Sequence, residues 1–389
     1  MIDFDKTVNR RGTASLKWDV DENELPMWVA DMDFPTAPCV TQAILAKAQS
    51  GVFGYQIVPD GWYSAIVNWW KTRHGFTIDR DWLCFTTGVV PAITSCVNHL
   101  TNVYDNVAVL TPVYDIFFHS IENTSRQTLE CPLVYDGERY AIDFKALERV
   151  LSHKKTTLMI LCNPHNPIGK VWSKQELAQI GELCAKYGVT VFSDEIHCDL
   201  TEPDAHYTPF SSASPTCRDI SVNAISASKA FNLAGLQSAA VFVPNERLRN
   251  KVVRGLNHDE VAEPNAFACD ATVAAFNGGG EWLDALREYI CANRRLVGEF
   301  LTENLPQLML IAQDATYLLW VDCSAVTEDS EKLCEFIREK TGLYLNCGAK
   351  YRGNGKYFIR LNVACPKSTL LDGLNRLKQG IDEYTRRTK

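Results

Sequence analysis

The chain has 389 residues, a length that favours two or three domains. Hydrophobic residues make up 46% and charged residues 22%, which is ordinary for a globular protein, and the net charge of −8 argues against a generic binder of nucleic acid or of an anionic membrane. No apolar run is long enough to span a bilayer, and the N-terminus lacks the pattern of a signal peptide, so we expect a cytoplasmic protein.

The 14 cysteines are scattered singly along the chain. They form no Cys-x-x-Cys pair and no Cys/His cluster with zinc-finger spacing, and the eight histidines form no His-x-x-x-His pair. We therefore expect free thiols in a reducing compartment, no disulfide framework and no metal site.

The N-terminal part predicts an extended arm followed by two helices. Prolines favour an extended backbone over residues 25–34, and Thr36 can cap a helix over residues 36–49. A tryptophan-rich helix is predicted over residues 60–74, and the loop before it has Tyr55 at an aromatic tip.

From residue 83 onward, short apolar segments alternate with helical patterns. Strands are predicted at residues 83–85, 106–110, 157–161, 190–193, 220–225 and 239–243. Helices are predicted between most of them, for example at residues 91–100, 113–121, 173–187 and 244–256. This alternation indicates an α/β fold with a mostly parallel sheet covered by helices, whose ligands bind beyond the carboxyl ends of the strands.

The three glycines at 278–280 mark a break, after which the pattern changes to an α+β end domain. Its predicted helices cover residues 282–305, 328–340 and 368–386, and its predicted strands cover residues 316–322, 343–345 and 357–361. We expect residues 1–50 to pack with this smaller domain (281–389), and residues 51–280 to form the larger, ligand-binding domain.

Lys229 lies among small and apolar residues directly after the predicted strand 220–225. Scarce water at the end of a buried strand disfavours the ammonium form, which makes the amine available to form a Schiff base. A lone lysine in such a place more often holds its ammonium in solvent, so other motifs must decide.

Three further motifs fall at the carboxyl ends of predicted strands. In Thr86-Thr-Gly-Val-Val-Pro-Ala92, the free N–H groups of Gly88, Val89 and Val90 at a helix start suit a phosphate. Asn163-Pro-His-Asn-Pro-Ile-Gly169 is a rigid loop that can fix an asparagine amide. Ser193-Asp-Glu-Ile-His197 offers a buried carboxylate, Asp194, that needs a cation or a strong donor, and a histidine that, taken alone, is more often a packed core residue than a ligand.

A cofactor with a phosphate, an aldehyde and a ring nitrogen would use all four motifs, and pyridoxal 5'-phosphate is such a cofactor. Lys229 would form the imine, Asp194 would keep the ring nitrogen protonated, and Asn166 would donate to the ring hydroxyl.

On these residues the sequence resembles the fold-type I pyridoxal-phosphate enzymes of the class I/II aminotransferase group, over essentially its full length, and within it the cystathionine β-lyase branch. The motifs that carry this resemblance are Leu25-Pro-Met-Trp-Val-Ala-Asp-Met-Asp-Phe34, Thr87-Gly-Val-Val-Pro91, Asn163-Pro-His-Asn-Pro167, Ser193-Asp-Glu-Ile-His197, Ser228-Lys-Ala-Phe-Asn-Leu-Ala-Gly235 and Arg360-Leu-Asn-Val-Ala-Cys-Pro366. The resemblance implies a seven-stranded sheet of the transferase-like type and a homodimer.

The resemblance also implies roles for individual residues. Tyr114 would stack on the cofactor ring, and Tyr55 would reach across the dimer interface to the partner's cofactor phosphate. Ser226 and Ser228 would flank the phosphate. The substrate would be bound by Arg360, which clamps its α-carboxylate, together with Asn166 and Ala30.

Two positions depart from the aminotransferase pattern. Gln237 stands where many aminotransferases carry an arginine that contacts the phosphate, and His197 stands where they carry a tyrosine. The charge of the phosphate must therefore be balanced elsewhere, and the role of His197 stays open.

We predict α,β-elimination from cystathionine or a related cysteine S-conjugate, which yields a thiol such as homocysteine, pyruvate and ammonia. The close alternative is an aminotransferase, which shares the early steps. An alternative of another class is a protein that binds a transcription regulator and has a secondary lyase activity. A serine hydrolase has little support because no Gly-x-Ser-x-Gly motif is present.

Overall fold

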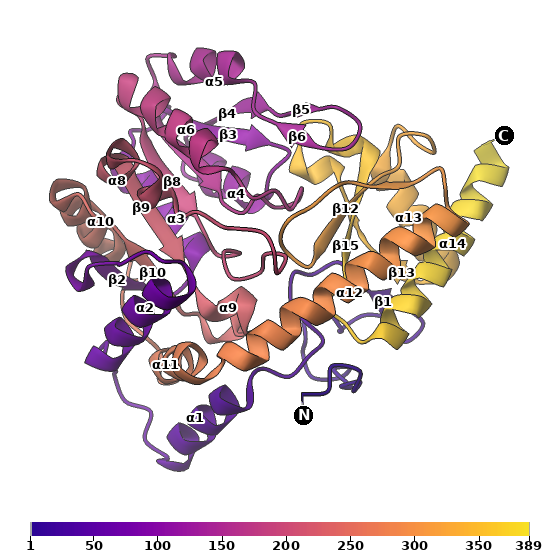
Figure 1. The fold of residues 1–389 in the computed structure, drawn as a ribbon, viewed down its shortest axis with the longest axis horizontal. Coiled ribbons are helices and arrows are strands. Elements are labelled where there is room, and N and C mark those ends of the chain that lie inside the picture. The colour runs from indigo at the N-terminus through magenta and orange to yellow at the C-terminus, as the bar shows by residue number, and fades with distance from the viewer. Residues whose placement is uncertain (1, 389) are drawn as a thin grey trace.

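The computed structural model describes residues 2–388, and a seven-stranded sheet dominates the first two thirds of the chain (Figure 1). In spatial order its strands are β2 (Leu83–Thr86), β10 (Ala239–Phe242), β9 (Ser221–Ile225), β8 (Thr190–Asp194), β7 (Thr156–Cys162), β3 (Asn106–Thr111) and β4 (Gln127–Pro132). β10 runs antiparallel to both neighbours and the other pairings are parallel. The predicted α/β class with a mostly parallel sheet is confirmed.

Helices cover both faces of this sheet. One face packs against α3 (Val89–Leu100), α4 (Ile116–Glu122) and α10 (Glu246–His258). The other face packs against α5 (Phe144–Leu151), α6 (Lys174–Lys186), α7 (Phe210–Ala213) and α8 (Pro215–Ile220). The remaining short elements here are η1 (Arg80–Trp82), β5 (Val134–Tyr135), β6 (Tyr140–Ala141), α9 (Ala227–Ala230) and η2 (Ala234–Leu236).

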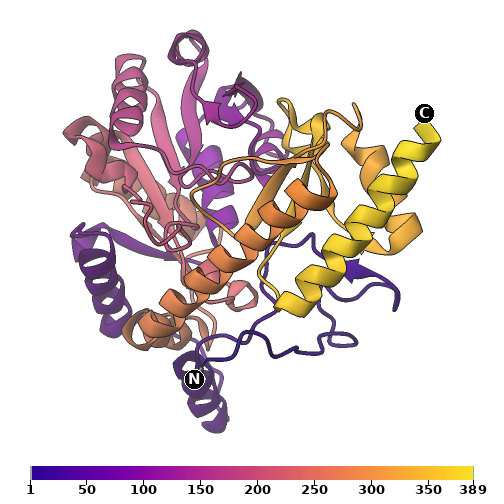
Figure 2. The same ribbon diagram turned by 45° about the vertical axis from the view of Figure 1, so that its right-hand side comes forward.

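The last third of the chain builds a second sheet (Figure 2). It has four antiparallel strands in the order β11 (Met309–Leu310), β12 (Leu318–Asp322), β15 (Phe358–Asn362) and β14 (Asn346–Cys347). Its helical elements are α12 (Gly280–Asn304), α13 (Ser330–Thr341), η3 (Ala349–Tyr351), η4 (Gly355–Tyr357) and α14 (Lys367–Thr388). The predicted α+β end of the chain is present.

The N-terminal arm belongs to this second part through its backbone. β1 (Leu25–Pro26) pairs in parallel with β13 (Leu343–Tyr344). In contrast, α1 (Pro38–Gln49) packs against α11 (Ala268–Gly278), which lies beside α2 (Asp60–Arg73) in the range expected for the larger domain. Packing of the first helix with the smaller domain is therefore not observed, whereas the domain boundaries stay a prediction.

The expected cap of the first helix is also not observed. The helix starts at Pro38 after Ala37 and has no side-chain cap, because Thr36 lies one residue too early. A proline at the first helical position has no N–H to cap, which lowers the need for one.

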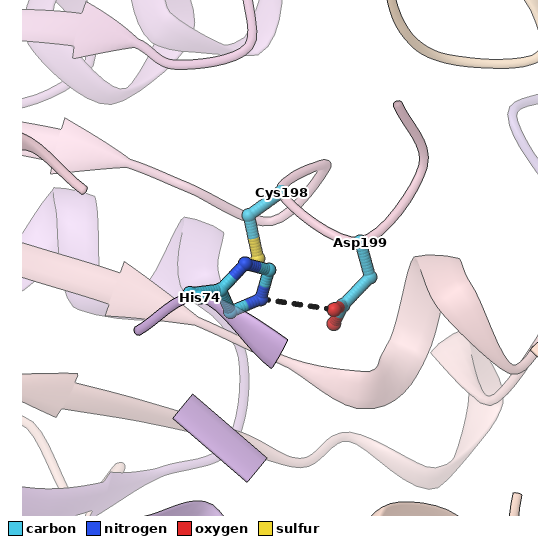
Figure 3. Close-up of side chains that lie close together, drawn as sticks. All are labelled: His74, Cys198 and Asp199. Atoms are coloured by element: carbon cyan, nitrogen blue, oxygen red, sulfur yellow. Dashed lines mark hydrogen bonds and ion pairs between the residues drawn. The ribbon is translucent and has the colours of Figure 1, made fainter. Parts of the chain in front are cut away.

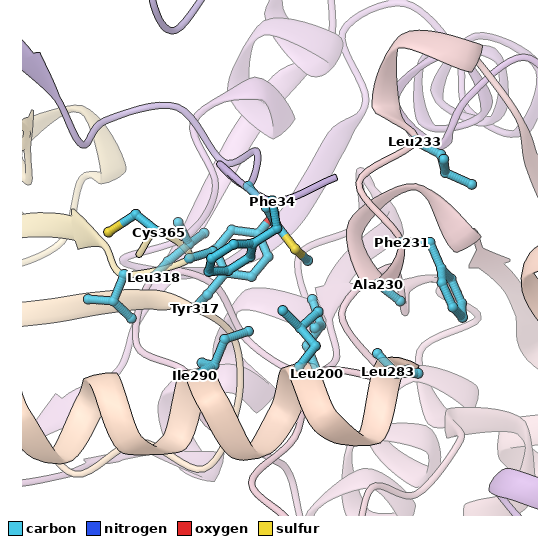
Figure 4. Close-up of a cluster of buried hydrophobic side chains, with 14 of the residues drawn as sticks. Phe34, Leu200, Ala230, Phe231, Leu233, Leu283, Ile290, Tyr317, Leu318 and Cys365 are labelled. Atoms are coloured by element: carbon cyan, nitrogen blue, oxygen red, sulfur yellow. The ribbon is translucent and has the colours of Figure 1, made fainter. Parts of the chain in front are cut away.

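A continuous apolar core joins the two parts of the molecule. Figure 4 shows it running from Phe231, beside α9, past Leu283 and Ile290 on α12 to Tyr317 and Leu318 at β12. This packing holds the second sheet against the carboxyl-end side of the first. Within residues 2–388 we find no helix whose length and apolar character would let it cross a membrane.

Candidate active site

A cavity of about 260 Å³ lies at the carboxyl ends of the parallel strands. The predicted site residues that line it are Ala30, Gly88, Val89, Val90, Tyr114, Asn166, Asp194, His197, Ser228 and Lys229. Asp194 ends β8, Ala30 comes from the arm, and the others follow β2, β3, β7, β8 and β9. Parallel strands bring their carboxyl ends to one edge of a sheet, so segments distant in sequence converge there.

Lys229 enters the cavity from α9, directly after β9. Its Nζ donates a hydrogen bond of 2.7 Å to the backbone oxygen of Ala30. Burial and the nearby positive charge of Arg360 lower the pKa of the lysine to about 8, although Asp31 and Asp194 oppose this shift. The neutral, nucleophilic amine is therefore populated near neutral pH, as a Schiff base requires.

Asp194 is the last residue of β8 and faces the same cavity. Its Oδ1 accepts a hydrogen bond of 3.1 Å from the amide of Ile196. Burial raises the pKa of this carboxyl to about 7, while the Ile196 amide and Lys229 pull it down. A carboxylate in such a place is ready to pair with a positively charged donor in the cavity.

The buried side chain of Glu195 fixes the end of β8 from behind. It accepts hydrogen bonds from Ser193 Oγ (2.7 Å), the amide of Phe210 (2.9 Å) and the hydroxyl of Tyr207. With these donors in place, Glu195 points away from the cavity, and Asp194 is left to face it.

His197 also lines the cavity, and it is neutral. Burial, with Lys229 and Arg360 nearby, lowers the pKa of its imidazole to about 3. The two residues after it, Cys198 and Asp199, lie beside His74 of the segment after α2 (Figure 3). His74 Nε2 and Trp69 Nε1 each lie 3.0 Å from Asp199 Oδ1, so α2 anchors the loop that carries His197.

His74, Cys198 and Asp199 offer metal-ligand atoms within 4.8 Å of one another. The sequence predicts no metal site, because His74 is far from the other two residues along the chain and forms no paired motif with them. The bonds of His74 and Trp69 to Asp199 give the group a structural role in joining α2 to the loop after β8.

Arg360, on β15, reaches the edge of the cavity from the second sheet without lining it. Its guanidinium donates to Asn166 Oδ1 (3.3 Å) and to the backbone oxygen of Trp28 (2.9 Å), and it lies over the ring of Tyr351 at 5.2 Å from the centroid. Asn166 follows β7 and lines the cavity, so the two predicted substrate-binding side chains are in contact.

The opposite end of the cavity is the N-terminus of α3, where Gly88, Val89 and Val90 lie. Gln237 and Ser238 complete this wall. Among the described residues that line the cavity, Lys229 is the only lysine or arginine, and His197 is neutral. An anionic group bound there would therefore depend on backbone amides and neutral donors of this chain.

Besides Arg360, two predicted residues do not line the cavity. Ser226 is the N-cap of α9: its Oγ accepts from the amide of Ser228 and donates to the backbone oxygen of Ser238 at 2.6 Å. Tyr55 lies in the loop between α1 and α2 and is fully exposed. The local sequence does not determine whether either side chain reaches the cavity.

Tyr317 and Asn232 were missed by sequence reasoning. The hydroxyl of Tyr317 donates to the backbone oxygen of Ala30 at 3.0 Å, and Asn232 holds the arm through the backbone of Met32 and Phe34. Asn232 stands in the predicted motif after Lys229, which could have pointed to it, whereas Tyr317 sits in an ordinary apolar stretch and gave no signal.

Comparison with known proteins gives a consistent result. The model of the family "Aminotransferase class I and II" matches residues 23–377. The chain is 41% identical over 386 residues to cystathionine beta-lyase PatB of Bacillus subtilis (98% of this chain and 100% of PatB). It is 32% identical over 389 residues to protein MalY of Escherichia coli (98% of this chain and 99% of MalY).

Solved structures agree with these relatives. Cystalysin from Treponema denticola, which contains a pyridoxal 5'-phosphate cofactor, matches with a TM-score of 0.95 at 31% identity, covering 98% of this chain and 99% of that chain. A PLP-bound putative aminotransferase from Clostridium difficile also matches with a TM-score of 0.95, at 35% identity, covering 98% of this chain and 100% of that chain.

Proposed function

Because the chain belongs to the class I and II aminotransferase family, we propose that it is a pyridoxal-phosphate-dependent carbon–sulfur β-lyase acting on cystathionine or a related cysteine S-conjugate. The observation that carries the proposal is the cavity that both the Lys229 amine and the Asp194 carboxylate line, close enough for the lysine to lower the pKa of the carboxyl. The overall reaction takes the S-conjugate and one water to a thiol, pyruvate and ammonia.

The residues present fit the cofactor. Asp194 is a buried carboxylate whose side chain accepts one amide, from Ile196, so it has capacity for a cationic donor such as a protonated ring nitrogen. Tyr114 lines the cavity and offers an aromatic face to a ring. When bound, pyridoxal 5'-phosphate supplies an aldehyde for the lysine amine and a ring that withdraws electrons from the substrate α-carbon.

Lys229 supplies the base for the reaction. Its pKa of about 8 leaves part of the amine unprotonated at neutral pH, so the Nζ atom can take the α-proton of the substrate. Departure of the thiolate from the β-carbon then leaves a three-carbon enamine, which water converts to pyruvate and ammonia.

Arg360 and Asn166 orient the substrate. The guanidinium of Arg360 is buried, and its Nε is unpartnered among the described residues. It can therefore receive an α-carboxylate with a bidentate geometry. The backbone at Ala30 closes the same side of the cavity.

The N-terminus of α3 would hold the cofactor phosphate through the amides of Gly88, Val89 and Val90, with Ser228 on the same cavity wall. Gln237 at the position of the usual arginine leaves this chain's own wall without a cation for the phosphate. Tyr55 of a second copy supplies one further donor in the proposed assembly.

We propose that this assembly is a homodimer. Exposed apolar side chains gather on α1 and on the loop that follows it, namely Leu45, Val52, Phe53, Tyr55 and Ile57. Exposed apolar side chains this close together along the chain are typical of an interaction surface, and a second copy would bury them. We also propose a cytoplasmic location, supported by the 14 cysteines, which are all free thiols.

Lys229→Ala tests the function directly. Wild-type protein incubated with pyridoxal 5'-phosphate should turn yellow and release pyruvate from cystathionine without any keto-acid acceptor. The variant should fold, since the lysine makes one hydrogen bond, but release at least about a hundredfold less pyruvate. Lys251→Ala, at an exposed position on α10, is the control and should keep full activity. Pyruvate from the Lys229 variant at the wild-type rate would reject the proposal.

The same assay separates the second candidate, an aminotransferase, which the family model and the Clostridium difficile relative favour. A transaminase would move the amino group of cystathionine to an added acceptor such as 2-oxoglutarate, which gives glutamate and the keto acid of the intact S-conjugate, with neither pyruvate nor free thiol. A lyase releases thiol and pyruvate together, whether or not the acceptor is present.

A further inference from the structure

Two side chains donate to one carbonyl oxygen at the edge of the cavity. Lys229 Nζ lies 2.7 Å from the backbone oxygen of Ala30, and the Tyr317 hydroxyl lies 3.0 Å from the same atom. Lys229 belongs to α9, Ala30 to the arm, and Tyr317 directly precedes β12. Three segments that are distant in sequence therefore meet at this oxygen.

We propose that Tyr317 is a positioning residue for the Lys229 amine, acting through the carbonyl oxygen of Ala30. The proposal rests on the proposed function, because it concerns the amine that serves as base there. Tyr317 touches the arm and not the cavity, so it acts through another group.

The geometry of this contact is rigid on both sides. The ring of Tyr317 is completely buried in the apolar core beside Phe34 and Leu318 (Figure 4). The peptide groups on either side of Ala30 are held by Asn362, whose Nδ2 lies 2.6 Å from the backbone oxygens of both Val29 and Asp31. The Ala30 oxygen therefore has a fixed position. Through its hydrogen bond it also fixes the position of the Lys229 amine when no cofactor is attached to that amine.

Sharing one acceptor also affects the proton on Lys229. A carbonyl oxygen has two lone pairs. A tyrosine hydroxyl that donates to one of them weakens the hydrogen bond that the same oxygen can accept from an ammonium group. Asp31 and Asp194 face Lys229 and favour the ammonium, whereas Arg360 opposes it and His197 is neutral. Tyr317 thus acts in the same direction as Arg360 and favours the free amine.

The test is the titration of Lys229 in Tyr317→Phe, measured without cofactor. Trace acetylation with acetic anhydride across a pH series, with the Lys229 peptide quantified by mass spectrometry, gives the midpoint directly. In wild-type protein the midpoint should lie near 8. In the variant it should rise by about 0.5–1 pH unit, which corresponds to one hydrogen bond. In the variant the backbone oxygen of Ala30 still accepts a hydrogen bond from Lys229, so the substitution leaves no buried acceptor without a donor.

Tyr140→Phe is the matched control. Tyr140 is also buried, and its hydroxyl bonds Asn354 (2.9 Å) and Trp320 (3.2 Å) away from the cavity, so the midpoint of Lys229 should not move. Acetylation of the exposed Lys251 calibrates each sample.

An unchanged Lys229 midpoint in folded Tyr317→Phe would overturn the proposal and leave Tyr317 as a packing residue. If that variant does not fold, the wild-type measurement decides: a midpoint near the ordinary lysine value of about 10.4 would overturn it equally. Because the labelling needs no cofactor and no turnover, it is interpretable even if the protein releases no pyruvate, which would count against the proposed function alone.

Discussion

Asp194 shows how a single residue can be costly for the fold and necessary for the site. Its carboxyl is buried at the end of β8 and accepts one backbone amide, from Ile196. Burial raises its pKa to about 7, so ionisation of Asp194 opposes folding when no cation lies opposite. A bound cofactor with a protonated ring nitrogen would remove that cost, which ties the cofactor to the stability of the protein.

Asp194→Asn should therefore stabilise the cofactor-free protein in a pH-dependent way. An acid whose pKa is higher in the folded state contributes stability below its unfolded pKa of about 4, and loses it as the pH rises through the folded value. The amide stays neutral at every pH, so the variant should gain roughly 1–3 kcal/mol in the free energy of unfolding near pH 9 and much less near pH 5. Urea titrations at the two pH values measure this difference.

The same substitution should reduce pyruvate release by the cofactor-loaded protein by about a hundredfold or more, since a fixed charge aimed at the reacting group is lost. A variant that is stabilised equally at both pH values would show that folding does not raise the pKa of this carboxyl, and would contradict the prediction.

Arg360→Lys tests recognition of the substrate carboxylate. A lysine keeps the positive charge but cannot form two parallel hydrogen bonds, so KM for cystathionine should rise about 10- to 100-fold with a smaller change in kcat. Arg249→Lys, whose parent side chain bonds the backbone oxygens of Val243 and Pro244 on α10's side of the large sheet, serves as the control. Loss of kcat with an unchanged KM would instead place Arg360 in the chemical step.

The chemical roles of individual residues could be predicted where those residues stand in a distinctive sequence motif. Lys229, Asp194 and Asn166 each follow a buried strand in a distinctive sequence, and the fold brings them to one cavity. Tyr317 could not be predicted, because its role depends on the arm, which lies almost 290 positions earlier in the chain and contacts it only through a backbone oxygen.

At the scale of elements, the N-terminal arm is held to the site by side chains that bind its backbone. Asn346 and Arg360 bind the oxygen of Trp28, Asn362 binds those of Val29 and Asp31, and Asn232 binds Met32 and Phe34. An irregular segment needs such partners because it has few backbone bonds of its own. The arm is thus part of the site wall and not a loose leader.

Asn232→Ala should release this arm. Asn232 makes three hydrogen bonds to it and adopts a left-handed backbone conformation that asparagine tolerates better than alanine. The variant should lose about 1–3 kcal/mol of stability, and the amides of residues 25–34 should exchange hydrogen faster than in the wild type. Asn257→Ala, on the exposed side of α10, is the control. Unchanged hydrogen exchange over these residues would mean that Asn346, Arg360 and Asn362 hold the arm in place without Asn232.

The strands and helices that the sequence predicts form within a few residues of their expected bounds, whereas several others, α5 among them, were not predicted. The predicted strands of the large sheet all form because each is a short, buried apolar run. β4 was missed because it is an edge strand with mostly half-exposed side chains, and α11 because its alanine-rich sequence has little polar contrast. The pairing of β1 with β13 joins the two ends of the chain, and no local pattern encodes it.

At the scale of the whole molecule, the site is incomplete within one chain if the proposed roles hold. Among the described residues that line the cavity, Lys229 is the only lysine or arginine, while Tyr55 projects into solvent from a loop with exposed Val52, Phe53 and Ile57. A homodimer would bury these exposed apolar side chains. The same interface would bring each Tyr55 to the other copy's phosphate site, where it would add a hydrogen-bond donor.

Mixing two inactive variants tests whether Tyr55 acts across the interface. Lys229→Ala removes the base, and Tyr55→Ala removes the crossing donor, so each homodimer should be nearly inactive. If Tyr55 serves the partner, a mixed dimer has one site with both residues intact, and random reassembly should restore about a quarter of the wild-type activity. Dilution to separate the subunits, followed by concentration and a pyruvate assay, provides the measurement. If Tyr55 instead serves its own chain, every site in the mixture lacks one residue, and no activity should return.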